Sequence, residues 1–161
     1  MNYTIYTDGA TSGNGYEGAQ GGWAWILLDE NEKIVLKSVG HLDNTTNNIC
    51  ELTAVLDACH NAWAGTELLD PNPTFTIYSD SSYIINCYKE KWYKKWQLNG
   101  WKNSKKQPVA NKELWELLIP YFEDSRFTFE KVKGHANNEY NNLVDKLAVE
   151  AKMILLGEID G

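Results

Sequence analysis

IYSDSS at residues 77–82 nearly repeats IYTDGA at residues 5–10, and each copy is a short run of β-formers that ends in an aspartate. Parallel neighbouring strands bring their C-terminal ends to one edge of a sheet, which is where open α/β sheets bind ligands. Asp8 and Asp80 would then face each other, and their like charges are costly unless a proton or a cation lies between them. Carboxylates without His or Cys favour a hard ion such as Mg²⁺ or Mn²⁺ over zinc. The alternative is that each aspartate only opens a turn or caps a helix.

The composition of the chain limits the class of protein. Its 161 residues are 43% hydrophobic, which fits one compact domain with a full core over residues 1–161. The sequence has no signal-peptide pattern and no apolar run of about 18 residues, so we expect a cytoplasmic protein that does not span a membrane. Cys50, Cys59 and Cys87 lack zinc-site spacing, which predicts buried reduced thiols rather than disulfides or structural zinc.

The charge of the chain is unevenly distributed. The formal net charge of -7 alone argues against a nucleic-acid partner, because phosphate binding is largely electrostatic. However, seven of the 15 Lys and Arg residues fall within residues 89–107, which we call the basic lobe, and Glu90 is the only acid there. The lobe is therefore a candidate surface for a polyanion. Its tryptophans are either core anchors or aromatic platforms beside a sugar-phosphate backbone, with Trp101 expected to be the most exposed of them.

The periodicity of apolar residues predicts an α/β fold. Residues 3–7 form a first strand that Asp8-Gly9 stops; a glycine-rich loop over residues 11–22 follows, and strands at 22–28 and 33–39 complete an antiparallel meander. A helix over about residues 45–64 crosses to a strand at residues 75–79, which the right-handed crossover rule places parallel to the first. Further elements are expected in this order: helices over residues 81–88, 90–98 and 111–121, a strand over 126–131 and a helix over about 140–155.

Three further candidate residues follow from their positions. Glu51 lies in the first two turns of the first helix, where it is either a metal ligand or a solvent-exposed acid favoured by the helix dipole. His135 lies in a polar loop and is either a group that carries a proton near neutral pH or surface decoration. Asp145 lies in the first turns of the last helix and alone would be an ordinary helix acid.

Together these residues resemble the type 1 ribonuclease H family over about residues 2–150, and the basic lobe is similar to that of bacterial members. The landmarks occur in the family's order: Thr7-Asp8-Gly9, Thr46-Asn47-Asn48 followed by Glu51, Ser79-Asp80-Ser81, Trp92 through Trp101 with its lysines, and Lys133-Gly134-His135 followed by Asp145. The resemblance implies a ribonuclease H-like fold, in which a five-stranded mixed sheet of order 3-2-1-4-5 is flanked by helices.

The resemblance also implies an endoribonuclease that hydrolyses the RNA strand of RNA-DNA hybrids by a two-metal-ion mechanism and leaves 5′-phosphate and 3′-hydroxyl ends. It implies two Mg²⁺ ions, or Mn²⁺ in their place, held by Asp8, Glu51, Asp80 and Asp145. His135 then matches a mobile histidine that moves a proton or assists product release. We expect a monomer whose partner is the hybrid and not a membrane. The residues expected to contact substrate are Asn14, Thr46, Asn47, Asn48, Ser82, Trp92, Lys94, Lys95, Trp96, Trp101, Lys102 and Lys105.

The sequence departs from the family pattern at substrate-binding positions. Lys95 replaces an asparagine that in bacterial members helps to hold a DNA phosphate, together with the residue that Thr46 matches. Ser82 replaces a common glutamine, Asn142 stands where a loop acid is frequent, and residues 154–161 form a C-terminal extension. Two other classes stay open, namely a non-catalytic nucleic-acid-binding domain on the same scaffold and a related nuclease that acts on DNA.

Overall fold

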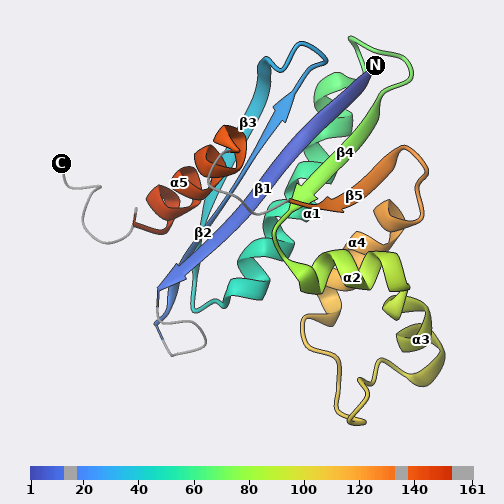
Figure 1. Ribbon diagram of the computed structural model, residues 1–161. Helices are drawn as coiled ribbons and strands as arrows, with labels where there is room; N and C mark the ends of the chain where they lie inside the picture. The colour runs from blue at the N-terminus through green and yellow to red at the C-terminus, as the bar shows by residue number, and fades with distance from the viewer. Residues whose placement is uncertain (13–17, 133–137, 154–161) are drawn as a thin grey trace.

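A five-stranded mixed sheet forms the centre of the computed structural model, which describes residues 1–12, 18–132 and 138–153 (Figure 1). The order of the strands is β3-β2-β1-β4-β5, as predicted. Their bounds are Asn2–Ser12 for β1, Gln20–Leu28 for β2, Ile34–Asp43 for β3, Thr74–Ser79 for β4 and Phe127–Lys131 for β5. β1 pairs antiparallel with β2 and parallel with β4, and Tyr6 stands opposite Tyr78. The two copies of the repeated motif therefore lie side by side.

Helices α1 (Asn47–Thr66) and α5 (Glu139–Met153) cover opposite faces of the sheet (Figure 1). Alternation along the strands explains this arrangement, since successive side chains point to opposite faces. On β2, Leu27 belongs to the core that includes residues of α1, whereas its neighbours Ile26 and Leu28 pack with Val144 of α5. None of the helices within the described residues combines the length and the apolar character that a membrane span requires.

The remaining helices lie beside β5 and carry the basic lobe away from the sheet. They are α2 (Ser82–Glu90), α3 (Trp92–Asn99) and α4 (Lys112–Phe122). Lys91 adopts the left-handed conformation, with φ of 55° and ψ of 45°, and so separates α2 from α3 within the expected helical stretch. Figure 1 shows the loop after α3 projecting away from the sheet.

Two helix caps set the positions of α1 and α2. The Thr46 hydroxyl accepts a hydrogen bond from the Ile49 N–H at 3.2 Å, and the Ser81 hydroxyl accepts one from the Ile84 N–H at 3.2 Å. A capping hydroxyl satisfies one of the free N–H groups in the first turn and so fixes where the helix starts. As a result, α2 begins at Ser82, and only Asp80 and the capping Ser81 separate it from the end of β4.

The first strand differs from its prediction, because β1 continues through Asp8-Gly9 to Ser12. The described parallel pairing with β4 ends at Tyr6, but pairing with β2 continues from Asp8 opposite Ala24 to Ser12 opposite Gln20. Gly9 therefore does not stop the strand. It allows α1 to approach, since a Cβ atom at this position would lie 2.8 Å from the backbone nitrogen of Glu51. The loop expected over residues 11–22 is strand at both ends, and residues 13–17 lie outside the described part.

Candidate metal centre

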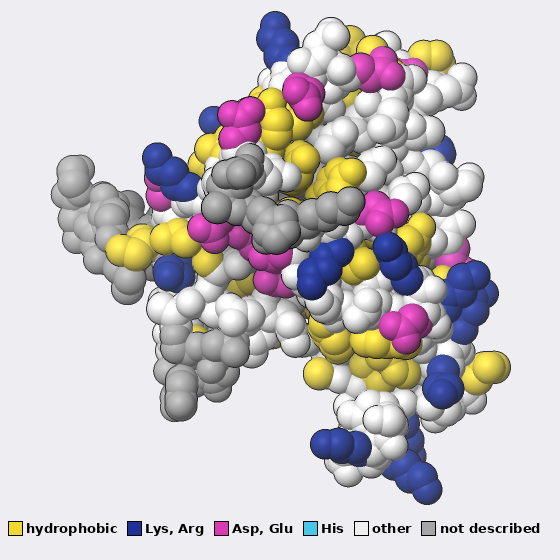
Figure 2. All heavy atoms as spheres, viewed as in Figure 1, with side chains coloured by type: hydrophobic (Ala, Val, Ile, Leu, Met, Phe, Trp, Pro, Cys, Tyr) yellow, Lys and Arg dark blue, Asp and Glu magenta, His cyan; other side chains and the backbone are white. Residues whose placement is uncertain are grey.

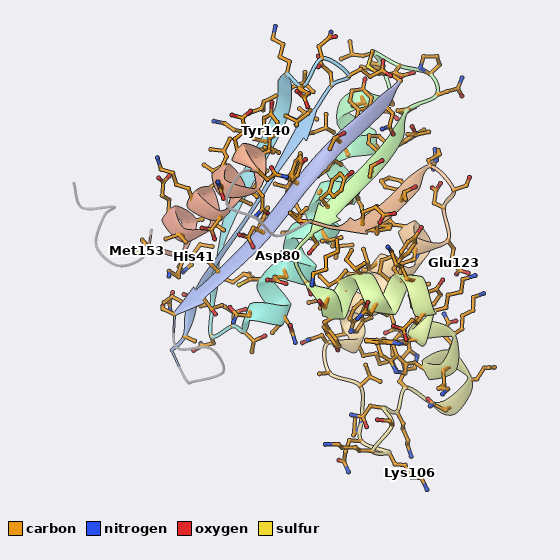
Figure 3. The ribbon with its side chains drawn as sticks, viewed as in Figure 1. His41, Asp80, Lys106, Glu123, Tyr140 and Met153 are labelled. Carbon is orange, nitrogen blue, oxygen red and sulfur yellow. The ribbon has the colours of Figure 1, made fainter. Side chains whose placement is uncertain are left out.

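Three carboxylates from three different elements meet at the C-terminal edge of β1 and β4. Asp8 lies in β1, Glu51 in the first turns of α1, and Asp80 directly after β4. One carboxylate oxygen from each of them lies within 4.8 Å of those of the other two. Asp8 is buried, Glu51 is half-buried and Asp80 is exposed, so the cluster is reached from the side of Asp80. Figure 3 labels Asp80 near the middle of the molecule, between the sheet and α2.

Burial and mutual repulsion disfavour the charged forms of these carboxylates. Burial raises the pKa of Asp8 to about 8, with contributions from the charge of Asp80 and from a hydrogen bond with Asp145. Burial also raises the pKa of Glu51 to about 7, and the charge of Asp80 adds to this shift. The pKa of Asp80 is raised by burial and by the charge of Asp145, while the positive charge of Lys131 opposes the shift. Asp145 on α5 is thus close enough to Asp8 and Asp80 to act on both of them.

The donor set of this cluster fits a hard divalent cation. The cluster formed by the described residues offers carboxylate oxygens and neither imidazole nor thiolate. Oxygen-only sets bind Mg²⁺, Mn²⁺ or Ca²⁺, whereas zinc favours His and Cys. A cation between the carboxylates would remove the repulsion that raises their pKa values. Asp8, Glu51 and Asp80 are therefore placed where they could hold such an ion together, and Asp145 lies within hydrogen-bonding reach of Asp8.

The metal-free protein is expected to lose stability as pH rises. Because the pKa values of Asp8 and Glu51 are raised on folding, the folded state retains protons that the unfolded state releases above about pH 4. The free energy of unfolding should then fall between about pH 4 and pH 8. The check is the melting temperature in chelator from pH 5 to pH 8.5, repeated with Mg²⁺. Mg²⁺ should raise the melting temperature mainly at the high end, and an equal rise at pH 5 would contradict the account.

The residues expected to contact substrate near the carboxylates lie at the starts of α1 and α2. Thr46 is half-buried and uses its hydroxyl to cap α1, while Asn47 and Asn48 are exposed in the first turn. The Asn47 side chain accepts a hydrogen bond from the Thr11 hydroxyl. Ser82 is exposed in the first turn of α2. Asn14 and His135, the other two predicted residues of this region, lie outside the described residues.

The tryptophans of the basic lobe anchor it to the body of the protein. Trp96 is buried, and its ring centroid lies 5.5 Å from that of Trp115 in α4 and 5.7 Å from that of Trp101. Trp92 and Trp101 are both half-buried. The prediction that Trp101 is the most exposed tryptophan of the lobe is therefore not met. The reason is that Trp101 folds back over α3, where its backbone N–H donates to the Trp96 carbonyl at 2.8 Å.

The lysines of the lobe are exposed around a hollow in its surface. A hollow of about 800 Å³ is lined in part by Trp92, Lys95, Trp96 and Lys102, while Lys94 and Lys105 lie on the exposed surface of the lobe. Lys and Arg side chains gather over this part of the molecule, and the labelled Lys106 lies at the far tip of the loop after α3 (Figures 2 and 3). The basic residues of the lobe thus form one surface despite the acidic character of the whole chain.

One residue near the carboxylates was not identified from the sequence. Lys131 is the last residue of β5 and stands opposite Ser79, the residue before Asp80. Its Nζ donates a hydrogen bond to the Ser82 hydroxyl at 2.6 Å. The sequence carries a signal for this residue, because a strand over residues 126–131 that lies next to the strand ending at Ser79 places residue 131 near Asp80.

Comparison with known proteins agrees with this arrangement. The family model RNase H matches residues 1–153. A protein of Thermoanaerobacter sp. (strain X514) named Ribonuclease H is 47% identical over 146 residues, which cover 91% of this chain and 86% of that protein. A Ribonuclease H of Clostridium botulinum (strain Hall) is 45% identical over 147 residues, which cover 91% of this chain and 93% of that protein.

Solved structures share the fold. LC11-RNase H1 in complex with RNA/DNA hybrid superposes with a TM-score of 0.69 at 22% identity, covering 96% of this chain and 99% of that one. The PFV RNase H domain superposes with a TM-score of 0.74 at 23% identity, covering 94% of each chain.

Proposed function

The chain belongs to the ribonuclease H family, and we propose from this membership and from its carboxylate cluster that it hydrolyses the RNA strand of RNA-DNA hybrids. The observation that carries the proposal is the meeting of Asp8, Glu51 and Asp80 within 4.8 Å at one edge of the sheet. A non-catalytic binding domain has no need of a costly group of partly buried acids. The hybrid in the LC11-RNase H1 complex supports the choice of substrate.

We propose that Asp8, Glu51, Asp80 and Asp145 hold two Mg²⁺ ions, which Mn²⁺ can replace. Such ions supply Lewis acidity toward the scissile phosphate and lower the pKa of bound water, so that hydroxide forms at neutral pH. The residues of the chain hold the ligands in place. The Gly9 N–H donates to the Asp8 carboxylate at 2.9 Å, and the Ser81 side chain hydrogen-bonds Glu51. His135 is proposed to move a proton or to assist product release.

Selection of RNA requires contacts to 2′-hydroxyl groups, which lie in the wide minor groove of the hybrid. The exposed side chains of Asn47, Asn48 and Ser82 lie at the carboxylate edge and offer both donors and acceptors. We propose that these residues, with Asn14, read the RNA strand. Thr46 and Lys95 are proposed to hold a phosphate of the DNA strand, and the rest of the basic lobe supplies attraction that does not depend on sequence.

We further propose that residues 1–161 act as one domain and as a monomer in the cytoplasm. The three cysteines are free and buried, as predicted, and such thiols are typical of proteins in a reducing compartment. The basic lobe, residues 89–107, is an appendage of this domain rather than a separate unit, because Trp96 joins the same core as Trp115 and Ile5.

The chemistry can be tested through the ends of the products. If water is the nucleophile and the 3′ oxygen is the leaving group, the RNA fragments would end in 5′-phosphate and 3′-hydroxyl groups, so a polymerase should extend them and a ligase should rejoin them. The measurement uses a hybrid whose RNA strand carries a label, with Mg²⁺ and with chelator as the control. Fragments that end in a 2′,3′-cyclic phosphate would show that the 2′-hydroxyl is the nucleophile, which would overturn the proposed mechanism.

A further inference from the structure

The end of β5 places a positive side chain beside the carboxylate cluster, outside the basic lobe. Lys131 stands opposite Ser79, and its Nζ reaches across to the Ser82 hydroxyl at 2.6 Å. Lys131 and Ser82 are both exposed. The ion pairs found among the described residues do not include Lys131, whereas the adjacent Glu130 pairs with Lys89 at 3.0 Å. Lys131 therefore differs from Lys89, whose charge already has a partner on the protein.

The hydrogen bond between Lys131 and Ser82 determines what the pair can bind. Because the Ser82 oxygen accepts from the ammonium, the hydrogen of its hydroxyl points elsewhere and is available to a ligand. The ammonium has two further N–H donors. The pair thus presents several donors and one positive charge. Such a set suits an anionic oxygen, with which it can form charge-assisted hydrogen bonds.

We propose that Lys131 and Ser82 form a subsite for one RNA-strand phosphate adjacent to the scissile phosphate, with Lys131 as a positioning residue. The inference rests on the proposed function, which puts the scissile phosphate at the carboxylates. The RNA strand is the strand concerned because the pair flanks Asp80, so the neighbouring phosphate of the cut strand is the anion within its reach. The basic lobe draws in the hybrid as a whole, whereas this subsite fixes the register of the cut strand.

A rival explanation is that Lys131 only offsets the negative charge of the carboxylates. A variant that keeps the length of the side chain and loses its charge tests whether Lys131 also contacts a phosphate. With a phosphate subsite, Lys131→Met raises the KM for a hybrid by about tenfold and lowers the slope of log affinity against log salt by somewhat under one unit. Lys131→Arg keeps most of the affinity, and kcat changes less than KM in both variants.

The decisive experiment pairs the protein variant with a modified substrate. A series of hybrids carries one neutral methylphosphonate linkage at successive RNA positions beside the cleavage site. For the parent protein, one linkage should raise KM about as much as Lys131→Met does. For Lys131→Met, the same linkage should add little, because each change removes the same interaction. Lys33→Met is the matched control, since Lys33 precedes β3 near Leu28 and Thr4, at the opposite end of the sheet.

The inference is overturned if the effects of linkage and variant simply add at every position, or if Lys131→Met behaves like Lys33→Met in KM and salt slope. Equal melting temperatures of the two variants would show that any difference does not arise from unfolding. The failure of the proposed function has a separate outcome, in which the parent protein leaves the unmodified hybrid uncut.

Discussion

Replacing Asp80 with asparagine is expected to remove nearly all cleavage of an RNA-DNA hybrid while leaving the fold intact. Asparagine keeps the shape of the side chain but lacks the negative charge that holds a divalent ion. The loss in kcat should be on the order of a thousandfold, at the upper end of what removal of a group that stabilises the transition state costs. In chelator the variant should melt at a higher temperature than the parent, because the change relieves the repulsion that raises the pKa values of Asp8 and Glu51.

The matched control for this substitution is Asp43→Asn. Asp43 is an exposed aspartate at the end of β3, and the described cluster of metal-ligating groups does not include it. Cleavage by Asp43→Asn should stay near the parent rate in Mg²⁺. If Asp80→Asn instead keeps more than about a tenth of the parent turnover, Asp80 does not hold the metal in the role assigned to it.

Neutralising four lysines of the basic lobe should weaken hybrid binding strongly and leave the chemical step largely unchanged. The protein has a net charge of -7, so a polyanion is repelled unless positive charge is concentrated where it docks. Changing Lys94, Lys95, Lys102 and Lys105 to glutamine should raise KM on the order of a hundredfold at low salt. The slope of log affinity against log salt should fall by somewhat under one unit for each phosphate that a lysine no longer neutralises.

A change of Lys33 and Lys37 to glutamine is the control for the loss of net charge. Both residues are exposed at the start of β3, far along the sheet from the lobe. Per charge removed, the control should alter KM and the salt slope much less than the lobe variant. If the lobe variant keeps its KM and its salt slope, its lysines form a solvated surface over a tryptophan-anchored core, and the docking surface must be sought elsewhere.

Much of the fold could be predicted from the sequence because its local patterns agree with one another. The repeat of the β-strand motif and the intervening helical periodicity indicated that β1 and β4 are parallel neighbours, which the pairing of Ile5 with Ile77 confirms. The predicted end of β1, at Asp8-Gly9, was wrong for a physical reason. A strand continues wherever it has a partner, and the pairing of Gly9 with Trp23 is a tertiary property that the letters Asp-Gly do not reveal.

The carboxylates of the site were accessible to sequence reasoning, whereas their surroundings were less so. Asp8 and Asp80 end two copies of one motif, and the position of Glu51 in the first two turns of the intervening helix made it a further candidate. Lys131 lies far along the chain from Ser82, and only the register of β4 with β5 brings them together. The half-burial of Trp101 depends on the chain folding back over α3, where the ring centroid of Trp101 lies 5.7 Å from that of Trp96.

The most direct test of the central claim is a comparison of three duplexes of one sequence, an RNA-DNA hybrid, duplex DNA and duplex RNA, each labelled on both strands and incubated with Mg²⁺. The account predicts cuts in the RNA strand of the hybrid, no cuts in its DNA strand, and little or no cleavage of the other two duplexes. Asp80→Asn should abolish the hybrid cuts. Cleavage of duplex DNA at a comparable rate, or binding of the hybrid without any cleavage in Mg²⁺, would contradict it.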